Sequence, residues 1–535
     1  MHWGSILAAL TTLVACTGST ESPVDSAPPA PTTCEDGVAV LPFSDDETGV
    51  QFGDRAADFA ATTLDGDTFR LSEAWNGCDS FVVISYFEGP GGDALWSSDP
   101  ENLFKNAPKN SQFIFASDEM GPARRESRLE AMRDALDLGP ARADRAHFLV
   151  DRLSSIEGGL GDFVTDYVAY LPESFVQIDA DRGSSAPVPS FLGIDRYQTW
   201  DPGGNTNDVV GGTPQIEIAG YLPLFYNHKA QLADRLASED VTEVELLNEE
   251  VTDRVFDRTV ELPADLSSFD TLEFDVEVTC KERNPFACSE WDRIARIDWC
   301  TDATCEERRE IVRWITPYWR RGNRRWAIDA SAFLGLVPGG TQTFRIAMGP
   351  GWERATPRDA RVTARLSTRG VPRPTSTVRV FTGGNFNADY NTNHPPVTLD
   401  VPAGATKVEL VTILSGHGQD VTTNCSEWCD HRHQFSIDGQ EAVLLQSDEG
   451  IGSRAGCAPA AAQGVPPGQW GNWAPQRAYW CPGLPVDPVA NDLTSLVTPG
   501  ASAELGYEAF LQGTFGPEGA GGGNISLSAY VAYYE

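Results

Sequence analysis

Short runs of alternating apolar and polar residues fill the chain from about residue 251 to residue 535. Such runs occur at 254–262, 271–279, 343–348, 376–381 and 407–414. Alternation with a period of two places one side of a strand in a core and the other in water, which is typical of antiparallel sheets. The chain contains 50 Gly and 36 Pro, so turn residues are plentiful between the runs. We therefore predict two antiparallel β-sandwich domains, at 251–372 and 373–535.

Residues 34–239 follow a different pattern, in which strands alternate with helices. Phe81–Phe87 is a continuous apolar run, which is typical of a strand in a sheet covered on both faces. Further strands are predicted at 112–117, 147–151 and 174–179, and helices at 121–138 and 222–236. The pattern predicts an α/β domain. Residues 240–250 are polar and acidic, and we interpret them as a linker.

One stretch of the α/β domain, Gly53-Asp54-x-x-Ala57-Asp58-Phe59, precedes an Asp65-Gly66 hairpin signal and the apolar strand. This order resembles thioredoxin and peroxiredoxin-like domains. The resemblance implies a low-pKa cysteine on the turn after that strand. The turn here reads Phe87-Glu88-Gly89-Pro90-Gly91-Gly92 and contains no cysteine. We therefore expect a redox-silent module with a binding or spacing role, and thiol chemistry is the lesser alternative.

The first residues contain a short apolar stretch, Ser5–Ala15, which is too short to span a bilayer. With Cys16 directly after Ala15, it resembles a bacterial lipoprotein signal, in which the cysteine is lipidated and becomes the mature N-terminus. Residues 1–4 lack Lys and Arg, which leaves an ordinary signal peptide open. We expect a signal peptide at 1–15, a Ser/Thr/Pro-rich tether at 16–33, and an exported lipoprotein at the outer membrane or cell surface.

The charge of the chain is strongly negative, with 77 acidic against 40 basic residues and a formal net charge of −37. Such a balance gives little electrostatic support to binding of a phosphate backbone. It predicts a highly solvated surface. We expect no nucleic-acid partner, membrane contact only through the lipid anchor, and a monomer.

Ten cysteines remain when Cys16 is set aside, an even number in a chain that looks exported. Their spacing suggests five disulfides: Cys34–Cys78, Cys280–Cys288, Cys300–Cys305, Cys425–Cys429 and Cys457–Cys481. Zinc is the alternative, because Cys-x3-Cys and Cys-x4-Cys lie near allowed ligand spacings. An oxidising compartment and strand-like flanks favour disulfides, each contributing about 2–4 kcal/mol.

The phrase Cys-Ser-Glu-Trp occurs twice, at 288–291 and again at 425–428. Asp292 and Arg293 directly follow the first copy, and Glu427 lies within the second. Two related modules that each offer a carboxylate would meet at a shared cleft. We therefore expect the catalytic residues of the chain at these two motifs.

Four stretches resemble the peptide-N-glycosidase F family. They are Cys288-x-Glu290-Trp291-Asp292-Arg293, Trp314-Ile315-Thr316-Pro317-Tyr318-Trp319, Cys425-x-Glu427-Trp428-Cys429 and Gly471-Asn472-Trp473-Ala474-Pro475-x-Arg477-Ala478-x-Trp480-Cys481-Pro482-Gly483. The resemblance implies two eight-stranded jelly rolls side by side and three of the five disulfides, those of Cys280, Cys425 and Cys457. It also implies an amidase, a hydrolase acting on carbon–nitrogen bonds other than peptide bonds. The substrate that the resemblance implies is the amide between N-acetylglucosamine and asparagine, and no metal or cofactor is implied.

Cleaving an unactivated amide requires a base or nucleophile, a donor for the developing negative charge and an acid for the departing nitrogen. Two carboxylates in different environments, Asp292 and Glu427, can divide such duties. The resemblance implies that Asp292 is the principal catalytic residue and that Glu427 lies near the first N-acetylglucosamine. It also implies that Arg293 and Arg477 shape the cleft. Arg477 beside Trp480 can equally be a packing and cation–π element.

The aromatic residues of these motifs, Trp291, Trp428 and Trp480, are predicted to lie in the core, because large aromatics dominate sandwich interiors. Substrate binding is assigned to Trp352 and His417, which match cleft positions of the family.

Two departures from the family pattern concern those cleft positions. The family places an acidic residue two positions before the tryptophan that matches Trp352. This chain has Gly349-Pro350-Gly351 there, so that carboxylate is missing, although Glu353 follows directly. The family's Ser-Gly-Trp-Gly is Ser415-Gly416-His417-Gly418 here, so an imidazole replaces a sugar-stacking aromatic.

Two alternatives to the amidase stay open. The first is a surface glycan-binding protein on the same scaffold with weak or no catalysis. The second is a copper-dependent monooxygenase-like protein, because His431 and His433 would share one face of a strand and suit a metal. Those enzymes, which look similar in architecture, need further histidines in the first sandwich, but 251–372 contains none. Copper chemistry is therefore the minor alternative.

Overall fold

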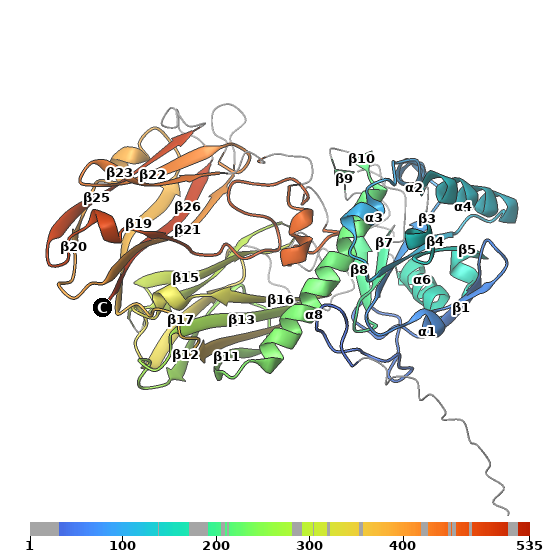
Figure 1. The fold of residues 1–535 in the computed structure, drawn as a ribbon, viewed down its shortest axis with the longest axis horizontal. Coiled ribbons are helices and arrows are strands. Elements are labelled where there is room, and N and C mark those ends of the chain that lie inside the picture. The colour runs from blue at the N-terminus through green and yellow to red at the C-terminus, as the bar shows by residue number, and fades with distance from the viewer. Residues whose placement is uncertain are drawn as a thin grey trace, which may run out of the picture.

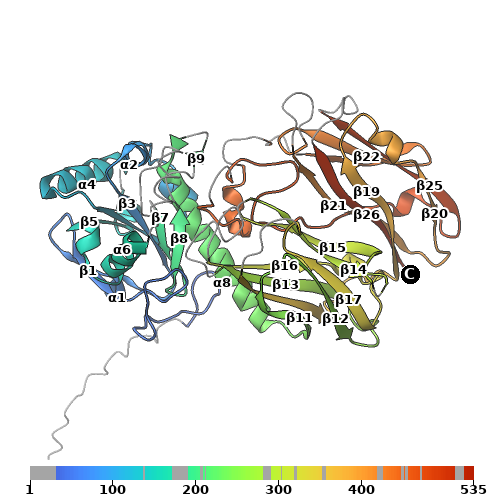
Figure 2. The same ribbon diagram turned by 180° about the vertical axis from the view of Figure 1, so that it is seen from behind.

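An α/β domain and two β-sandwiches lie side by side, and one long helix, α8 (Leu222–Ser238), lies between the α/β domain and the sandwiches (Figures 1 and 2). The computed structural model describes residues 32–136, 139–170, 191–204, 209–210, 213–280, 291–302, 304–317, 322–351, 357–418, 426–447, 451, 456–469, 473–511 and 523–535. Within these ranges, no helix has both the length and the apolar character needed to cross a membrane. The predicted signal peptide, Cys16 and most of the tether lie outside them.

The α/β domain is built on a five-stranded mixed sheet of order β5-β4-β3-β7-β8. Its strands are β3 (Ser80–Tyr86), β4 (Ser111–Ser117), β5 (Ala146–Arg152), β7 (Phe191–Ile194) and β8 (Trp200–Gly204). Strands β3, β4 and β5 are parallel to one another, and β7 pairs in the antiparallel sense with both of its neighbours, β3 and β8. Every residue of β3 is buried, which explains its continuous apolar run.

Helices flank this sheet (Figure 1), and short strands form two further small sheets of three and two strands. The helices include α1 (Leu71–Ala74), α2 (Pro90–Trp96), α3 (Leu103–Asn106), α4 (Pro122–Leu136), α5 (Pro140–Ala143), α6 (Gly159–Tyr170) and α8 (Leu222–Ser238). The short strands are β1 (Phe59–Thr62), β2 (Thr68–Arg70), β6 (Glu157–Gly158), β9 (Val209–Val210) and β10 (Thr213–Pro214). The α/β architecture is thus confirmed, whereas the thioredoxin-like assignment stays a prediction. The strand predicted at 174–179 lies outside the described residues.

The first sandwich consists of two four-stranded antiparallel sheets, of order β11-β18-β13-β16 and β12-β17-β14-β15. The strands are β11 (Thr242–Val251), β12 (Val255–Leu262), β13 (Thr271–Cys280), β14 (Ile294–Cys300), β15 (Arg308–Ile315), β16 (Gly322–Asp329), β17 (Gly340–Ala347) and β18 (Arg358–Ser367). Alternate residues of the facing strands, such as Phe274 and Ile346, are fully buried between the sheets.

The linker predicted at 240–250 is wrong, because residues 242–251 form strand β11 and pair with β18. A bulge between Glu245 and Leu247 breaks the alternation, and both Leu246 and Leu247 are buried. The glutamates of β11 face solvent, so the amino-acid composition of this strand resembles that of a charged linker.

The second sandwich repeats the arrangement, with sheets of order β19-β26-β21-β24 and β20-β25-β22-β23. The strands are β19 (Ser376–Asn385), β20 (Val397–Asp400), β21 (Lys407–His417), β22 (His431–Ile437), β23 (Gln440–Gln446), β24 (Val489–Asp492), β25 (Ser502–Leu511) and β26 (Asn524–Tyr534). The predicted pair of antiparallel sandwiches is therefore confirmed, although the sequence pattern does not predict β16, β23 or β24.

Short 3₁₀ helices connect the longer elements. They include η1 (Leu153–Ser155), η2 (Ile216–Tyr221), η4 (Ser331–Phe333), η5 (Asn391–Asn393), η6 (Pro459–Gln463) and η7 (Thr494–Leu496). Of these, η2 and η6 lie where the α/β domain meets the second sandwich, because both contribute to one apolar core.

The two sandwiches share a second apolar core, which continues from the first into Val411, Ile413 and Tyr530 of the second. A buried ion pair between Arg313 and Glu310, 2.6 Å apart, lies at the same boundary. Arg313 donates to the carbonyl of Ser526 at 2.7 Å, and the Tyr530 hydroxyl donates to the carbonyl of Glu310 at 2.6 Å. These contacts fix the two sandwiches relative to each other, and with them the cleft between.

Three predicted disulfides are confirmed: Cys34–Cys78, Cys300–Cys305 and Cys457–Cys481, with Cα separations of 5.6, 4.8 and 5.6 Å. Cys280 and Cys429 are also disulfide-bonded. Their predicted partners, Cys288 and Cys425, lie outside the described residues.

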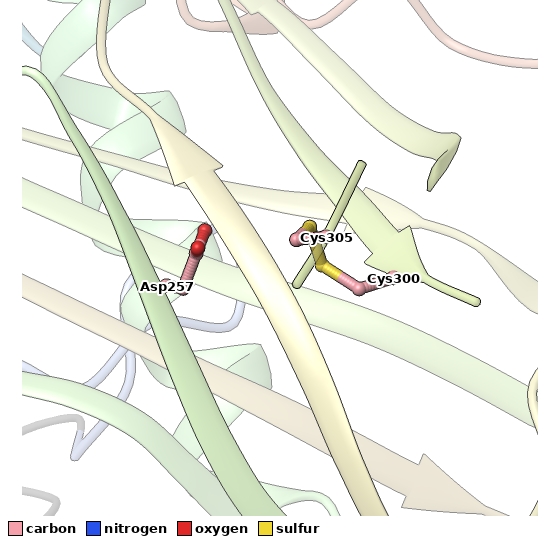
Figure 3. Close-up of side chains that lie close together, drawn as sticks. All are labelled: Asp257, Cys300 and Cys305. Carbon is pink, nitrogen blue, oxygen red and sulfur yellow. A yellow bond between two sulfur atoms is a disulfide. The ribbon is translucent and has the colours of Figure 1, made fainter. Parts of the chain in front are cut away.

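Asp257 lies close to Cys300 and Cys305, a grouping that resembles a metal site (Figure 3). The two sulfurs are bonded to each other and so are not free thiolate ligands. Both oxygens of Asp257 instead accept hydrogen bonds from Arg345, at 2.7 and 2.9 Å. The zinc alternative is wrong for this cysteine pair.

Candidate active site

A cleft of about 840 Å³ opens between the two sandwiches. The first sandwich lines it with Val255, Trp291, Asp292, Arg293, Ile294, Arg296, Arg308, Arg345, Ala347, Gly349, Pro350 and Gly351. The second lines it with His417, Gly418, Glu427, Trp428 and Trp480. Four predicted site residues, Asp292, Arg293, His417 and Glu427, thus meet in one cavity although they are far apart in the sequence.

Asp292 lies two residues before β14, and a threonine holds the backbone on both sides of it. The Thr316 hydroxyl accepts a hydrogen bond from the Arg293 N–H at 2.8 Å and donates to the Trp291 carbonyl at 3.2 Å. The Thr316 N–H also donates to the Arg293 carbonyl at 2.9 Å. The Asp292 side chain is only 10% exposed. This bridge fixes where the carboxylate points, and no such role for Thr316 follows from the sequence alone.

Arg477 is fully buried and lies between the two carboxylates. Its Nη2 is 3.7 Å from Asp292 Oδ2, and its Nε is 3.6 Å from Glu427 Oε1. Both separations exceed a normal hydrogen bond, so these contacts are chiefly electrostatic. The guanidinium also lies over the rings of Trp428 and Trp480, at 4.5 and 5.1 Å. The cation–π interpretation of Arg477 is therefore confirmed, whereas Arg477 lies behind the wall of the cleft and does not line it, so its predicted part in substrate binding stays a prediction.

Backbone carbonyls set the position of Arg477. Its Nη1 donates to the carbonyls of Trp473 and Pro475 at 3.2 and 2.7 Å. The N–H of Cys457 donates to the Ala474 carbonyl at 2.7 Å, and the Cys457–Cys481 disulfide closes the loop. The buried cation is thus held by a loop that is itself cross-linked.

The α/β domain packs against this same loop. Its apolar core includes Ile218 and Phe225 and continues into Ala461, Val465 and Trp473 of the second sandwich. These last three residues belong to η6 and to the segment that leads from it to Arg477. The α/β domain is therefore part of the support of the site, which goes beyond the predicted binding or spacing role.

Glu427 is a partly buried carboxyl on the opposite wall from Asp292. Burial raises the pKa of Glu427, while Arg477 and the Gly418 N–H oppose the shift. That N–H donates to Glu427 Oε2 at 3.3 Å. The Glu427 N–H donates to the Gly418 carbonyl at 3.1 Å, and its carbonyl accepts from the Ala478 N–H at 2.9 Å. A carboxyl with a raised pKa can retain a proton and donate it, which is the role of a general acid.

His417 is neutral at ordinary pH, because burial and nearby arginines lower its pKa to about 3. Its Nε2 is 2.7 Å from the Ser415 hydroxyl, which also accepts a hydrogen bond from Arg313 at 2.9 Å. The imidazole stacks on Trp480 with ring centroids 4.9 Å apart. His417 therefore presents an uncharged ring to the cleft.

The three tryptophans of the motifs are placed differently from one another. Trp480 is 5% exposed and donates to the Gly416 carbonyl at 2.7 Å, as the core prediction requires. Trp428 is half-buried and lines the cleft, so its core prediction is met only in part. Trp291 is 48% exposed at the cleft, so its predicted place in the core is wrong.

The position of Trp291 has a local cause. It lies in the turn before β14, outside the alternation that directs strand residues into the core. Large amphipathic aromatic side chains are enriched at interfaces, and Trp291 offers such a surface to a ligand. Trp352, the other aromatic residue assigned to substrate binding, lies outside the described residues.

The histidines considered for copper do not line the cleft and lie in a buried hydrogen-bond network. His431 and His433 contact each other through ring nitrogens 3.0 Å apart. The other nitrogen of His431 is 2.7 Å from the Ser426 carbonyl, and that of His433 is 2.7 Å from the Tyr507 hydroxyl. All four ring nitrogens are thus engaged, which favours a structural role.

Comparison with known proteins supports the resemblance in the second half of the chain. Residues 385–532 match the family model described as Peptide-N-glycosidase F, C terminal. The peptide-N(4)-(N-acetyl-beta-D-glucosaminyl)asparagine amidase F of Elizabethkingia miricola is 28% identical over 259 residues, which cover 44% of this chain and 68% of that protein.

Solved structures of similar proteins include PNGase F, a glycosylasparaginase from Flavobacterium meningosepticum. It is 23% identical, covers 56% of this chain and 96% of its own, and has a TM-score of 0.41. PNGF-II is 11% identical, with 57% of this chain and 67% of its own covered and a TM-score of 0.44.

Proposed function

We propose that this protein is an amidase that hydrolyses the bond between N-acetylglucosamine and asparagine in N-linked glycoproteins or glycopeptides, converting asparagine to aspartate. The observation that carries the proposal is the pair of carboxylates, Asp292 and Glu427, on either side of the buried Arg477. Each carboxylate comes from one of the motifs that resemble the family, and both line one cleft. The 28% identity to an amidase of this specificity adds support.

In the proposed reaction, Asp292 accepts a proton from a water molecule whose oxygen adds to the side-chain carbonyl carbon of asparagine. The bond from that carbon to nitrogen breaks, and the nitrogen leaves with its sugar as a glycosylamine after taking up a proton. Glu427 is the proposed proton donor, because its pKa is raised by burial. Arg477 places a positive charge 3.7 Å from Asp292 Oδ2, beside the carboxylate that accepts the proton.

The test uses a denatured N-glycoprotein in heavy-oxygen water, with peptide masses as the readout. Wild-type protein is expected to convert asparagine to aspartate with one heavy oxygen, and Asp292→Asn to lose this activity. Asp400→Asn is the matched control, because Asp400 is exposed on β20, where it accepts a hydrogen bond from Ser502 at 2.7 Å. Failure of the wild type to convert any asparagine would overturn the proposal.

A glycan-binding protein on this scaffold is the second candidate. It is favoured by Gly349, Pro350 and Gly351, which line the cleft where the family has a carboxylate, and by the exposed Trp291. Glycopeptide binding by both wild type and Asp292→Asn, with no release of glycan by either, would establish it.

We also propose that the protein is an exported monomeric lipoprotein anchored through Cys16, with no nucleic-acid partner. The sequence of the first 16 residues supports the anchor. Cys16→Ser should move the protein from the membrane fraction to the soluble fraction. Retention of the variant at the membrane would count against the anchor, and light scattering gives the oligomeric state.

A further inference from the structure

A second hollow, of about 530 Å³, lies between the sandwiches and adjoins the candidate cleft. The two cavities share Arg296 and Arg308 in their walls. We call it the arginine hollow, because its lining includes Arg296, Arg308, Arg309, Arg313 and Arg379. The first four come from β14 and β15 of the first sandwich, and Arg379 comes from β19 of the second.

The arginines of the hollow are only partly neutralised. Arg313 is matched by the buried Glu310. Arg296 and Arg308 share one carboxylate, Asp298, at 3.2 and 3.1 Å. Burial raises the pKa of Asp298, and this one carboxylate faces two guanidinium groups.

Arg309 and Arg379 complete the surplus of positive charge. Arg309 reaches Glu307 only at 3.9 Å, and Glu307 is 74% exposed. Glu306, which also lines the hollow, faces solvent as well. Arg379 donates to the Arg308 carbonyl at 3.2 Å, and no carboxylate of the described residues forms an ion pair with it.

The two arginines also act on each other. Burial and the like charge of Arg309 lower the pKa of Arg379. A bound anion would relieve this repulsion through charge-assisted hydrogen bonds, in a chain whose net charge is −37.

The backbone leaves room for a ligand beside these side chains. A Cβ at Gly384 would meet no atom within 4 Å, so the hollow is open there. At Gly383 a Cβ would lie 1.9 Å from the Ile525 carbonyl oxygen, so β19 and β26 approach closely at that point. Thr382 and Ser526 add polar groups to the lining.

We propose that the arginine hollow binds an acidic substituent on the outer part of an N-glycan: the carboxylate of a sialic acid, or a sulfate or phosphate ester. The inference rests on the proposed function and names the class of substrate. The innermost sugar would occupy the cleft, and the shared wall at Arg296 and Arg308 would let one oligosaccharide reach both cavities. Planar guanidinium groups suit these anions, which they bind through paired N–H donors.

The test compares a sialylated biantennary glycopeptide with the same glycopeptide after sialidase treatment. Wild-type kcat/KM is expected to be about tenfold higher for the sialylated form, as one charged hydrogen bond supports. Arg379→Gln and Arg309→Gln should each bring the ratio of the two kcat/KM values toward one. Arg258→Gln on β12 should keep the wild-type ratio, because Arg258 lines neither cavity. Sulfated and phosphorylated glycopeptides then distinguish the source of the anion.

Equal cleavage of the two forms by the wild type would overturn the subsite and leave the amidase standing. If the wild type cleaves neither form, the proposed function fails. Calorimetric binding of the same two glycopeptides then tests whether the arginine hollow binds the acidic substituent. Tighter binding of the sialylated form that Arg379→Gln abolishes would support it. Equal binding would overturn it.

Discussion

Gly464 is a point of close contact between the α/β domain and the loop that leads to Arg477. Its φ is +111°, and an added Cβ would lie 2.8 Å from Nε2 of His228 on α8. The His228 ring also makes a hydrogen bond to the backbone of Ala462. Gly464→Ala therefore perturbs the contact between the domains without removing any side chain of the cleft.

The loss of folding stability expected for Gly464→Ala has two parts. A side chain in the left-handed region costs about 1–2 kcal/mol. Displacing the His228 ring adds about 1–3 kcal/mol of overpacking. Gly439 separates the two parts, since its φ is +78° but a Cβ there meets nothing within 4 Å. Gly439→Ala should show only the backbone cost.

The assay is the thermal unfolding midpoint together with kcat/KM on a denatured N-glycoprotein. For a domain of this size, each kcal/mol lowers the midpoint by about 2–4 °C. The unfolding midpoint should fall further in Gly464→Ala than in Gly439→Ala. Gly464→Ala should also lose activity, whereas Gly439→Ala should keep the wild-type kcat/KM. Adding His228→Ala to Gly464→Ala should restore part of the loss. An equal loss for both glycines, or wild-type activity in folded Gly464→Ala, would refute the view that the α/β domain positions Arg477.

Three further predictions concern the site. Arg477→Met leaves two part-buried carboxylates without this cation, and should cost about 3–5 kcal/mol of stability and abolish turnover, as melting and kinetics would show. Thr316→Val removes both hydroxyl bonds beside Asp292 and should lower kcat, whereas Thr343→Val, which breaks only an exposed 2.9 Å contact with Thr259, should not. The raised pKa of Glu427 means that its ionisation costs stability as pH rises through that pKa. Above this pH, Glu427→Gln should therefore have a higher unfolding midpoint than the wild type, and at lower pH the two midpoints should be nearly equal. The variant should also lose activity. A difference between the two midpoints that does not change with pH would contradict the raised pKa of Glu427.

Local sequence determined the two sandwiches, some of the disulfides and part of the candidate site. The period-two alternation predicts both sandwiches, because the faces of a strand are set by consecutive residues. Spacing predicts the disulfides Cys300–Cys305 and Cys457–Cys481. The repeated motif identifies Asp292 and Glu427 as residues of one site, and the structure places both on one cleft.

Only the tertiary structure decided the rest, because packing joins residues that are remote in the chain. A bulge conceals β11 from any count of alternating residues. The Thr316 bridge, the burial of Arg477 between two tryptophans and the support from α8 all depend on contacts between distant segments. The arginine hollow likewise exists only where β14 and β15 meet β19, since no stretch of sequence gathers its arginines from both sandwiches.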